Sequence, residues 1–367
     1  MTGQPVILDW YGCDLRSGQI TEELRGLSCS QPLTRKLGES TTGSLSLPLA
    51  GAPPSWEAAT TPGRTMLVCV DRATGQPITA GIVTTREGGT DATLSLGIVS
   101  PEAYFDRRYA APIEAFGLDQ AVILTTTGAP LLVQGPPFVF DAPATGVTTT
   151  YEVADGDDRT ILSVWQDLLD QDGGPEWTVD VAWNAAQNGF TLPVRVRGAN
   201  GIGQVTTAPM AVFDLPGCIS SYTLTESYEA EKGATSVRAY GDGEGDARLH
   251  SDDYTADQLL AAGYALFEYR YTPASATTDP DALNASAAGT LAAMAPGSTV
   301  WSVTATASAA PRLGTDFALG DSVGVQITTS PRHPTGASTV ARCWAWQLDP
   351  GADTVQPILI DDDSEET

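Results

Sequence analysis

Short runs in which apolar and polar positions alternate recur along the whole chain. Val, Thr and aromatic residues dominate these runs, and Gly, Pro, Asp and Ser stand between them. Alternation with a period of two residues is typical of half-buried antiparallel strands, and the intervening residues supply turn geometry. The pattern predicts strands at residues 44–49, 65–70, 78–83, 92–99, 177–183, 190–197, 221–228, 299–307, 322–327 and 339–348. A parallel α/β fold needs a helix after nearly every strand, and the sequence lacks that pattern. We therefore expect a mainly β fold.

Helical periodicity is confined to a few segments. Residues 157–174 open with Asp residues that can cap a helix, place Ile161, Trp165 and Leu168 on one face, and stop at Gly173. Two further helices are predicted at residues 255–264 and 279–297, and a single turn at 100–112. So few helices, placed between groups of strands, indicate small inserts beside β units.

The order of these segments predicts two β units, each joined to a helix-containing insert. We expect α+β inserts in a mainly β fold, with a short acidic end that is disordered. The expected divisions are a first β-barrel at 1–145, an α/β insert at 146–210, a second β-barrel at 211–245 and 299–357, a helix-containing insert at 246–298, and an acidic tail at 358–367.

The charge of the chain is strongly negative. Its 367 residues include 45 acids and 19 bases, which gives a net charge of −26. Such a surface repels phosphate backbones and anionic lipids, which disfavours nucleic-acid readers and membrane-surface proteins. The sequence has no run of 18 apolar residues and opens without a basic leader, so we expect neither membrane insertion nor secretion by a signal peptide.

Cysteine and histidine offer little for metal or nucleophilic chemistry. The cysteines are odd in number and scattered, as expected for reduced thiols in a protein assembled in cytoplasm. A zinc site or a histidine-based dyad would need one of only two histidines, and both stand in polar stretches typical of surface loops. These residues are Cys13, Cys29, Cys69, Cys218, Cys343, His250 and His333.

Three acidic stretches look superficially like ligand sites. The glycine-rich GDGEGD (241–246) would present like charge to a pyrophosphate, so we interpret it as an acidic turn. DGDD (155–158) and DQDGG (170–174) lack the closing Glu of a calcium loop and are placed to begin and end a helix. No cofactor and no metal site is predicted.

Two alternatives to a structural role remain open. Paired carboxylates for glycoside hydrolysis depend on a separation in space that sequence does not give. Trp344 and Trp346 are predicted on one face of a strand and could stack on a sugar, although buried aromatics in a β core explain this spacing more often. The alternatives are a cell-wall hydrolase and a carbohydrate-binding receptor module.

Several stretches, taken in order, resemble the minor tail proteins that form the tail-tip or baseplate hub of long-tailed bacteriophages. The most specific piece is LGDSVGV (319–325), where hub proteins often show a Gly-Asp turn before a barrel strand. The matching stretches are SLSLPLAG (44–51), residues 62–87, YFDRRY (104–109), residues 239–254, residues 263–294 and residues 311–327.

The resemblance implies an architecture and an assembly. It implies two tail-tube-like antiparallel β-barrels and two small helix-containing domains in each chain. Three chains then give six barrels and adapt a sixfold tail tube to a threefold tip. It also implies a homotrimer in the virion tail tip, assembled in the host cytoplasm beside the distal tail protein, the tape measure protein and other tail-tip proteins. No enzymatic activity and no catalytic residue are implied. In such a particle the alternatives are a virion-associated cell-wall hydrolase and a carbohydrate-binding receptor module.

The negative net charge of the chain is consistent with a channel through which DNA passes. An acidic lumen offers phosphate no counterion to replace, so DNA passes through without specific binding. Arg107 and Arg108 depart from this trend, and we expect them to point away from the channel into a subunit contact.

The turn Gly320-Asp321 is the candidate structural site. It separates an apolar approach from an alternating strand that starts at Ser322. We expect Gly320 to take a positive φ that a Cβ would oppose, and Asp321 to accept hydrogen bonds from backbone N–H groups of its own turn.

Overall fold

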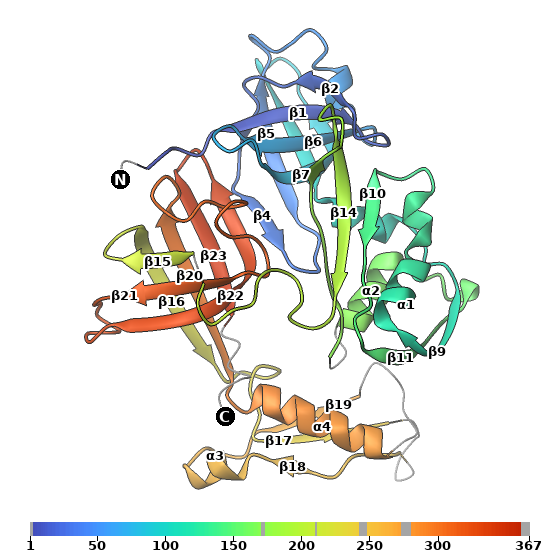
Figure 1. Cartoon of the computed structure of the whole chain (residues 1–367), viewed down its shortest axis with the longest axis vertical. Helices are drawn as coiled ribbons and strands as arrows, with labels where there is room; N and C mark the ends of the chain where they lie inside the picture. Colours follow the sequence, from blue (N-terminus) through green and yellow to red (C-terminus); the bar gives the residue numbers. More distant parts are fainter. Residues whose placement is uncertain (1–2, 170–172, 210, 242–247, 273–279, 361–367) are drawn as a thin grey trace.

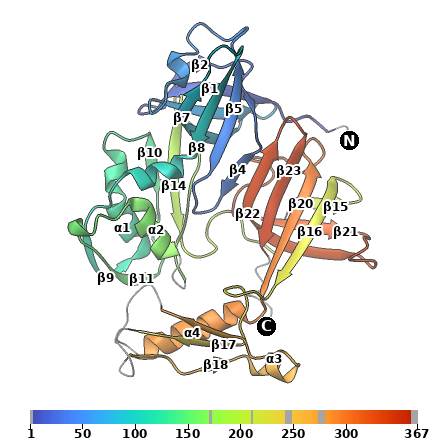
Figure 2. The same ribbon diagram turned by 180° about the vertical axis from the view of Figure 1, so that it is seen from behind.

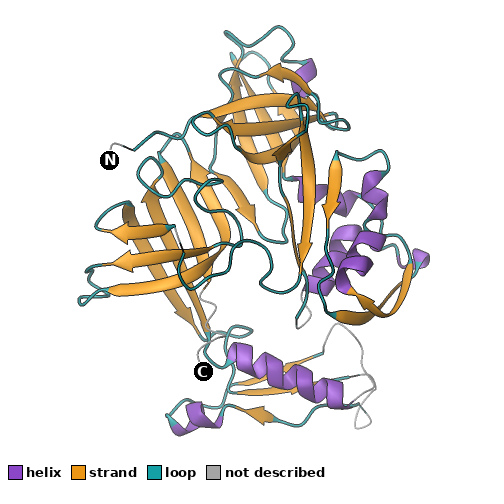
Figure 3. Cartoon of the chain, viewed as in Figure 1, coloured by secondary structure: helices purple, strands orange, loops and turns teal. Residues whose placement is uncertain are grey.

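The computed structural model describes residues 3–169, 173–209, 211–241, 248–272 and 280–360. The fold is mainly β with small helical parts, as Figure 3 shows by colour. Two curled sheets lie side by side, a helix-containing insert flanks the first, and a small α/β domain hangs below the second (Figure 1). No helix within the described ranges is long and apolar enough to cross a bilayer.

The first sheet is antiparallel and has the strand order β2-β1-β6-β7-β8-β5-β3. Its members are β1 (Leu8–Asp14), β2 (Ile20–Glu23), β3 (Ser28–Cys29), β5 (Thr42–Pro48), β6 (Thr65–Asp71), β7 (Pro77–Glu87) and β8 (Thr93–Val99). A one-turn 3-10 helix, η1 (Ala58–Thr60), precedes β6. The predicted strands 44–49, 65–70, 78–83 and 92–99 are therefore confirmed as β5 to β8.

The second sheet has the order β15-β21-β22-β23-β20-β16. It consists of β15 (Val212–Leu215), β16 (Ile219–Ser227), β20 (Ser298–Thr306), β21 (Ser322–Ile327), β22 (Ala337–Asp349), β23 (Thr354–Ile360) and, as a seventh strand that pairs with β22, β4 (Leu33–Lys36). Its pairs are antiparallel except β15 with β21, which is parallel. The second sheet is therefore antiparallel as expected, apart from the parallel pair β15–β21 at its edge.

Strand β4 (Leu33–Lys36) crosses between the sheets. It follows β3 in the sequence, yet it pairs with β22 of the second sheet, with Leu33 opposite Leu348. The two opposite views in Figures 1 and 2 both show β4 beside β22. One apolar core is shared by the two sheets and includes Trp10 of β1 and Trp301 of β20. The sheets therefore form one packed body.

The insert is built from a four-stranded sheet, a two-stranded sheet and two α-helices. Its elements are η2 (Pro101–Arg107), β9 (Ile113–Asp119), α1 (Gln120–Thr127), η3 (Ala129–Leu132), β10 (Phe138–Asp141), β11 (Thr148–Val153), η4 (Asp155–Asp157), α2 (Ile161–Leu169), β12 (Glu176–Val179), β13 (Ala182–Trp183) and β14 (Phe190–Arg197). Helix α2 confirms the helix predicted within 157–174, and η2 confirms the turn at 100–112. The predicted strands 177–183 and 190–197 are β12 to β14.

The boundary expected at residue 145 is wrong. Strands of the first sheet end at Val99, and residues from Phe105 to Phe138 pack into the same core as α2 and β14. That second core also contains Met66 and Val68, whereas Leu67 and Cys69 of the same strand face the core between the sheets. Strand β6 is buried on both faces because the insert covers its outer side, which explains its continuous apolar sequence.

The small α/β domain has a separate core. It contains β17 (Ser236–Ala239), β18 (Tyr254–Thr255), α3 (Asp257–Ala261), β19 (Glu268–Tyr271) and α4 (Pro280–Met294), with Val237, Leu283 and Ala287 buried between sheet and helix. Helices α3 and α4 confirm the helices predicted at 255–264 and 279–297. Strand β17 pairs with β19, so the expected assignment of residues up to 245 to the second barrel is wrong.

The end of the chain also differs from expectation. Strand β23 continues to Ile360 because Ile358 and Ile360 pair with β22 and β20. Residues 358–360 therefore belong to the second sheet and not to an acidic tail. The rest of that predicted tail, 361–367, lies outside the described residues, as do 242–246 of the acidic turn and 170–172 of the DQDGG segment.

Candidate functional site

The predicted turn Gly320-Asp321 lies where the second sheet meets the loop that leaves the insert. Gly320 has a φ of +84°, so the expected positive φ is confirmed. A Cβ at Gly320 would lie 2.1 Å from the carbonyl oxygen of Ile202. Gly203, with a φ of +86°, approaches from the other side, and its Cβ would lie 2.2 Å from the carbonyl carbon of Gly320. The two backbones touch at a point where neither position has room for a side chain.

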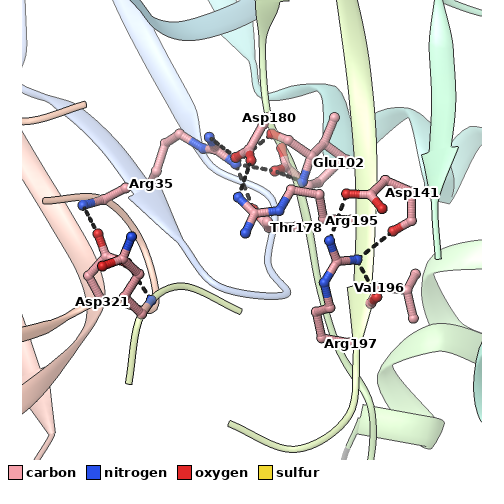
Figure 4. Close-up of polar contacts among 12 residues, drawn as sticks. Arg35, Glu102, Asp141, Thr178, Asp180, Arg195, Val196, Arg197 and Asp321 are labelled. Atoms are coloured by element: carbon pink, nitrogen blue, oxygen red, sulfur yellow. Dashed lines mark hydrogen bonds and ion pairs between the residues drawn. The ribbon is translucent and has the colours of Figure 1, made fainter. Parts of the chain in front are cut away.

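Asp321 fastens the same two segments (Figure 4). Its Oδ2 accepts a hydrogen bond from the N–H of Ala318, 2.8 Å away in its own turn, as expected. Its Oδ1 accepts a second from the N–H of Gln204 at 2.6 Å, which was not expected. The N–H of Ser322 donates to the carbonyl of Gln204 at 2.9 Å. The turn therefore joins the loop 198–206 to the start of β21.

A buried ion pair lies directly behind this turn. Arg342 of β22 forms a two-point ion pair with Glu176 of β12, and both side chains are buried. The Arg342 guanidinium also donates to the carbonyls of Gly320 at 2.9 Å and Ile202 at 2.7 Å. The N–H of Ile202 donates to Glu176 Oε2 at 3.0 Å. Every side of the pair is hydrogen-bonded, as buried charges require.

A second arginine binds the insert to β4 (Figure 4). The buried Arg35 donates from Nη2 to Glu102 Oε1 at 3.0 Å, to Thr178 Oγ1 at 2.8 Å and to the carbonyl of Val179 at 2.6 Å. Asp180 lies 3.5 Å from Arg35 Nη1. The positive charge of β4 thus meets two acidic residues of the insert.

A third arginine binds the second sheet to the first. Arg312 forms a two-point ion pair with Asp71 at 2.7 Å and also donates to the carbonyl of Gln4 at 2.6 Å. Burial acts to raise the pKa of Asp71, but the hydrogen bonds from Arg312 and from the Ala73 N–H outweigh it, so the pKa lies below its ordinary value. We call the three pairs, Arg35–Glu102, Arg342–Glu176 and Arg312–Asp71, the arginine clamps.

The sequence pattern does not predict the clamps. Arg342 does carry a signal, because it stands in the apolar strand TVARCWAWQL where the alternation calls for a buried residue. A charged residue at such a position needs a buried partner. The partner could not be named, since Glu176 is 166 residues away in the chain.

Arg107 and Arg108 lie elsewhere, at the end of η2. Arg107 is exposed. Arg108 donates to the carbonyl of Val133 at 2.9 Å and lies over the ring of Tyr104, so much of its side chain is occupied within its own chain. The structure does not bring these arginines near Gly320 and Asp321.

Trp344 and Trp346 do not share a face, which corrects the prediction. The pairing of β22 with β23 shifts register between Cys343 and Ala345, so a β-bulge at Trp344 reverses the alternation. Trp346 is buried in the core between the sheets, while Trp344 is half-buried outside it. The proposed sugar-stacking pair is therefore absent from the strand.

The thiols and acids of the described residues offer no metal site. Within the described ranges, no group of three or more His, Cys, Asp or Glu side chains is placed to hold a metal ion. Burial raises the pKa of Cys13 and of Cys29 to about 12, and it raises that of Cys343 further. Thiols with such pKa values stay protonated near neutral pH and react slowly.

Comparisons with known proteins identify the fold. No protein-family model and no curated protein matches the sequence. A solved tail protein from Neisseria meningitidis is 14% identical, with a TM-score of 0.59 over 98% of this chain and 97% of that one. Prophage tail protein gp18 from Listeria monocytogenes is 11% identical, with a TM-score of 0.56 over 97% and 95%. The 43 kDa tail protein of prophage MuSo2 from Shewanella oneidensis is 12% identical, with a TM-score of 0.59 over 96% and 97%. The chain therefore has, over nearly its whole length, the fold of phage tail proteins.

Proposed function

We propose that the chain is a structural hub protein at the tip of a phage tail, which adapts a sixfold tail tube to a threefold tip as a homotrimer. The observation that carries this proposal is the pair of seven-stranded sheets in one chain. Three chains present six sheets, the number that a sixfold tube needs to continue into a threefold structure.

The arginine clamps support the proposal because a hub must hold its two sheets at a fixed angle. Each clamp joins two parts of the chain that are distant in sequence: β4 to the insert, β22 to the insert, and the loop before β21 to β6. Together with the shared apolar core they stiffen the body. A rigid pair of sheets transmits the symmetry of the tube to the tip.

Charge gives separate support. A trimer of chains with a net charge of −26 each offers an acidic lining to a channel, and DNA phosphates release no counterions on such a surface. DNA then passes without binding. The neighbours that the proposal implies are the distal tail protein, the tape measure protein and other tail-tip proteins.

Reconstruction of the intact tail by electron cryo-microscopy tests the proposal. We expect three copies of the chain at the tip, with their six sheets in one ring. Six copies, one copy, or a position along the tube would contradict it. In tails that still contain DNA, the reconstruction should also show no density that connects the DNA to the ring.

A further inference from the structure

Four arginines differ from most cations of the chain. Arg16, Arg64, Arg107 and Arg108 form no ion pair with a carboxylate of the described residues. The same holds for Arg248 of the small α/β domain, which lies over the ring of Tyr240. By contrast, exposed Arg72 of the first sheet pairs with an acid. On a chain with 45 acids and 19 bases, cations left without an ion pair need an explanation.

One of these arginines lines a groove, and the others belong to segments beside it. Arg16 lines a groove of about 600 Å³ together with Leu132, the last residue of η3, and Gly135 of the loop that follows. On one side, Arg108 donates to the carbonyl of Val133, and Arg107 precedes it in the chain. On the other side, the N–H of Leu15 donates to the carbonyl of Arg64 at 2.9 Å, which sets the backbone of Arg64 beside the turn that carries Arg16.

Exposed apolar side chains lie among the arginines. Tyr109 is 64% exposed, Leu132 52% and Val133 61%. Acids lie here as well: Asp14 lines the groove, Asp106 accepts a hydrogen bond from Thr160, and Asp158 stands two residues before the Thr160 that pairs with Tyr109. The pKa of Asp14 is lowered by hydrogen bonds from Ser17 and by the nearby charge of Arg64, so it is ionised. Arginines and exposed apolar side chains thus lie together on this surface.

We propose that this arginine patch (Arg16, Arg64, Arg107, Arg108, Tyr109, Leu132 and Val133) binds the acidic surface of a second copy of this chain. Arginine and aromatic side chains among exposed apolar groups are the composition of a protein interface. A second copy supplies the complementary charge, since it carries −26. The patch and the acidic surface differ, so the contact is heterologous and can close a ring. This inference rests on the proposed trimer.

Nucleic acid is the weaker fit. Leu132 and Val133 offer no hydrogen bond to phosphate, and the net charge of the whole chain repels it. An acidic protein surface satisfies both the arginines and the apolar groups.

Site-specific photo-crosslinking of the full-length chain tests the patch. A benzophenone amino acid replaces Leu132, and in a matched control it replaces Phe116, which is 76% exposed on β9. Each purified protein is irradiated at increasing concentration, and the joined peptides are mapped by mass spectrometry. We expect position 132 to join an Asp- and Glu-rich surface of a second chain, in a yield that falls in 0.5 M salt.

Charge variants complete the test. Arg16→Glu with Arg107→Glu should lower the yield at position 132 by about tenfold, whereas Arg16→Lys with Arg107→Lys should retain most of it. Equal crosslinking yields at positions 116 and 132 would overturn the patch. So would a yield at position 132 that is the same in the Glu and Lys variants. Self-association without a crosslink at 132 would overturn the patch but not the trimer. Binding of a DNA duplex that the Glu variants abolish would assign the patch to nucleic acid and also overturn the inference.

Discussion

Arg342 and Glu176 form a buried two-point ion pair that joins β22 of the second sheet to β12 of the insert. The pair also holds the backbone of Ile202 from both sides, through its N–H and its carbonyl. One side-chain pair thus fixes the sheet, the insert and the loop between them, and it places the backbone of Gly320 against Ile202.

Removing one member of this pair should be costly. Arg342→Met leaves Glu176 buried without its cation, and such a loss typically costs about 3–5 kcal/mol of unfolding free energy. Chemical denaturation of the full chain measures it. The matched control is Arg270→Met, which breaks the exposed pair of Arg270 with Glu268 and should cost about 0–1 kcal/mol. Equal costs for the two variants would show that the clamp does not hold the body together.

Gly320→Ala should destabilise the chain more than a change at an equally left-handed glycine. Left-handed backbone alone costs a non-glycine residue about 1–3 kcal/mol, and the contact with Ile202 forces the backbones apart for about 1–3 kcal/mol more. Gly26 has a φ of +82° and open space around it, so Gly26→Ala carries only the first cost. Thermal or chemical unfolding compares the two. A smaller loss at Gly320 than at Gly26 would mean that the loop 198–206 simply moves away.

Asp321→Ala should cost about 1–3 kcal/mol, because it removes hydrogen bonds from a carboxylate to the N–H groups of Gln204 and Ala318. Asp321→Asn keeps an acceptor oxygen and should lose less. Hydrogen exchange of the Gln204 amide reports the contact directly. Unchanged protection of Gln204 in the alanine variant would show that the bond contributes nothing.

The sequence predicts the strands well where one face is buried and the other is not. Strands such as β5 and β8 alternate cleanly, and β14 alternates through all eight of its residues. The sequence pattern does not predict helix α1, QAVILTTT, because its β-branched residues favour a strand. The segment is helical because Asp119 caps it and its apolar side chains enter the insert core.

Long-range features were beyond the sequence. The pairing of β4 with β22 depends on two sheets meeting, and nothing in LTRK specifies the partner. The bulge at Trp344 changes which tryptophan is buried without changing the spacing of the sequence. For the candidate site, the positive φ of Gly320 followed from turn chemistry, while its contact with Ile202 is set by the tertiary fold.

The Asp71–Arg312 clamp should make stability depend on pH. Because the pKa of Asp71 in the folded chain lies below its ordinary value of 3.8, the clamp stabilises fully above that pH and is lost as the pH falls through the folded pKa. The difference in unfolding free energy between the wild type and Asp71→Asn should be constant from pH 5 to 7 and shrink below about pH 4. The difference in unfolding free energy between the wild type and Arg312→Gln should shrink over the same pH range. A difference that grows on acidification contradicts the clamp.

The small α/β domain should be removable without loss of the main body. Ser227 at the end of β16 and Ser298 at the start of β20 are direct partners in the ladder, so the whole domain is inserted at the tip of one hairpin. Its core, around Val237 and Leu283, is separate from the core between the sheets. Replacing residues 228–297 by Asn-Gly, which favours a two-residue hairpin turn, should therefore preserve the fold.

The shortened chain should unfold cooperatively. The unfolding free energy of the two sheets should change by about 1 kcal/mol or less, because the deletion removes no side chain from their shared core. Chemical denaturation followed by tryptophan fluorescence measures it, since Trp10 and Trp301 remain. The control replaces residues 120–132, which carry the fully buried Ile123, Leu124 and Leu131 of the insert core, by the same turn. That change should unfold the insert, since each buried apolar side chain lost costs several kcal/mol. If instead the chain without 228–297 aggregates, the two sheets need the small domain to fold, and it is not an independent module.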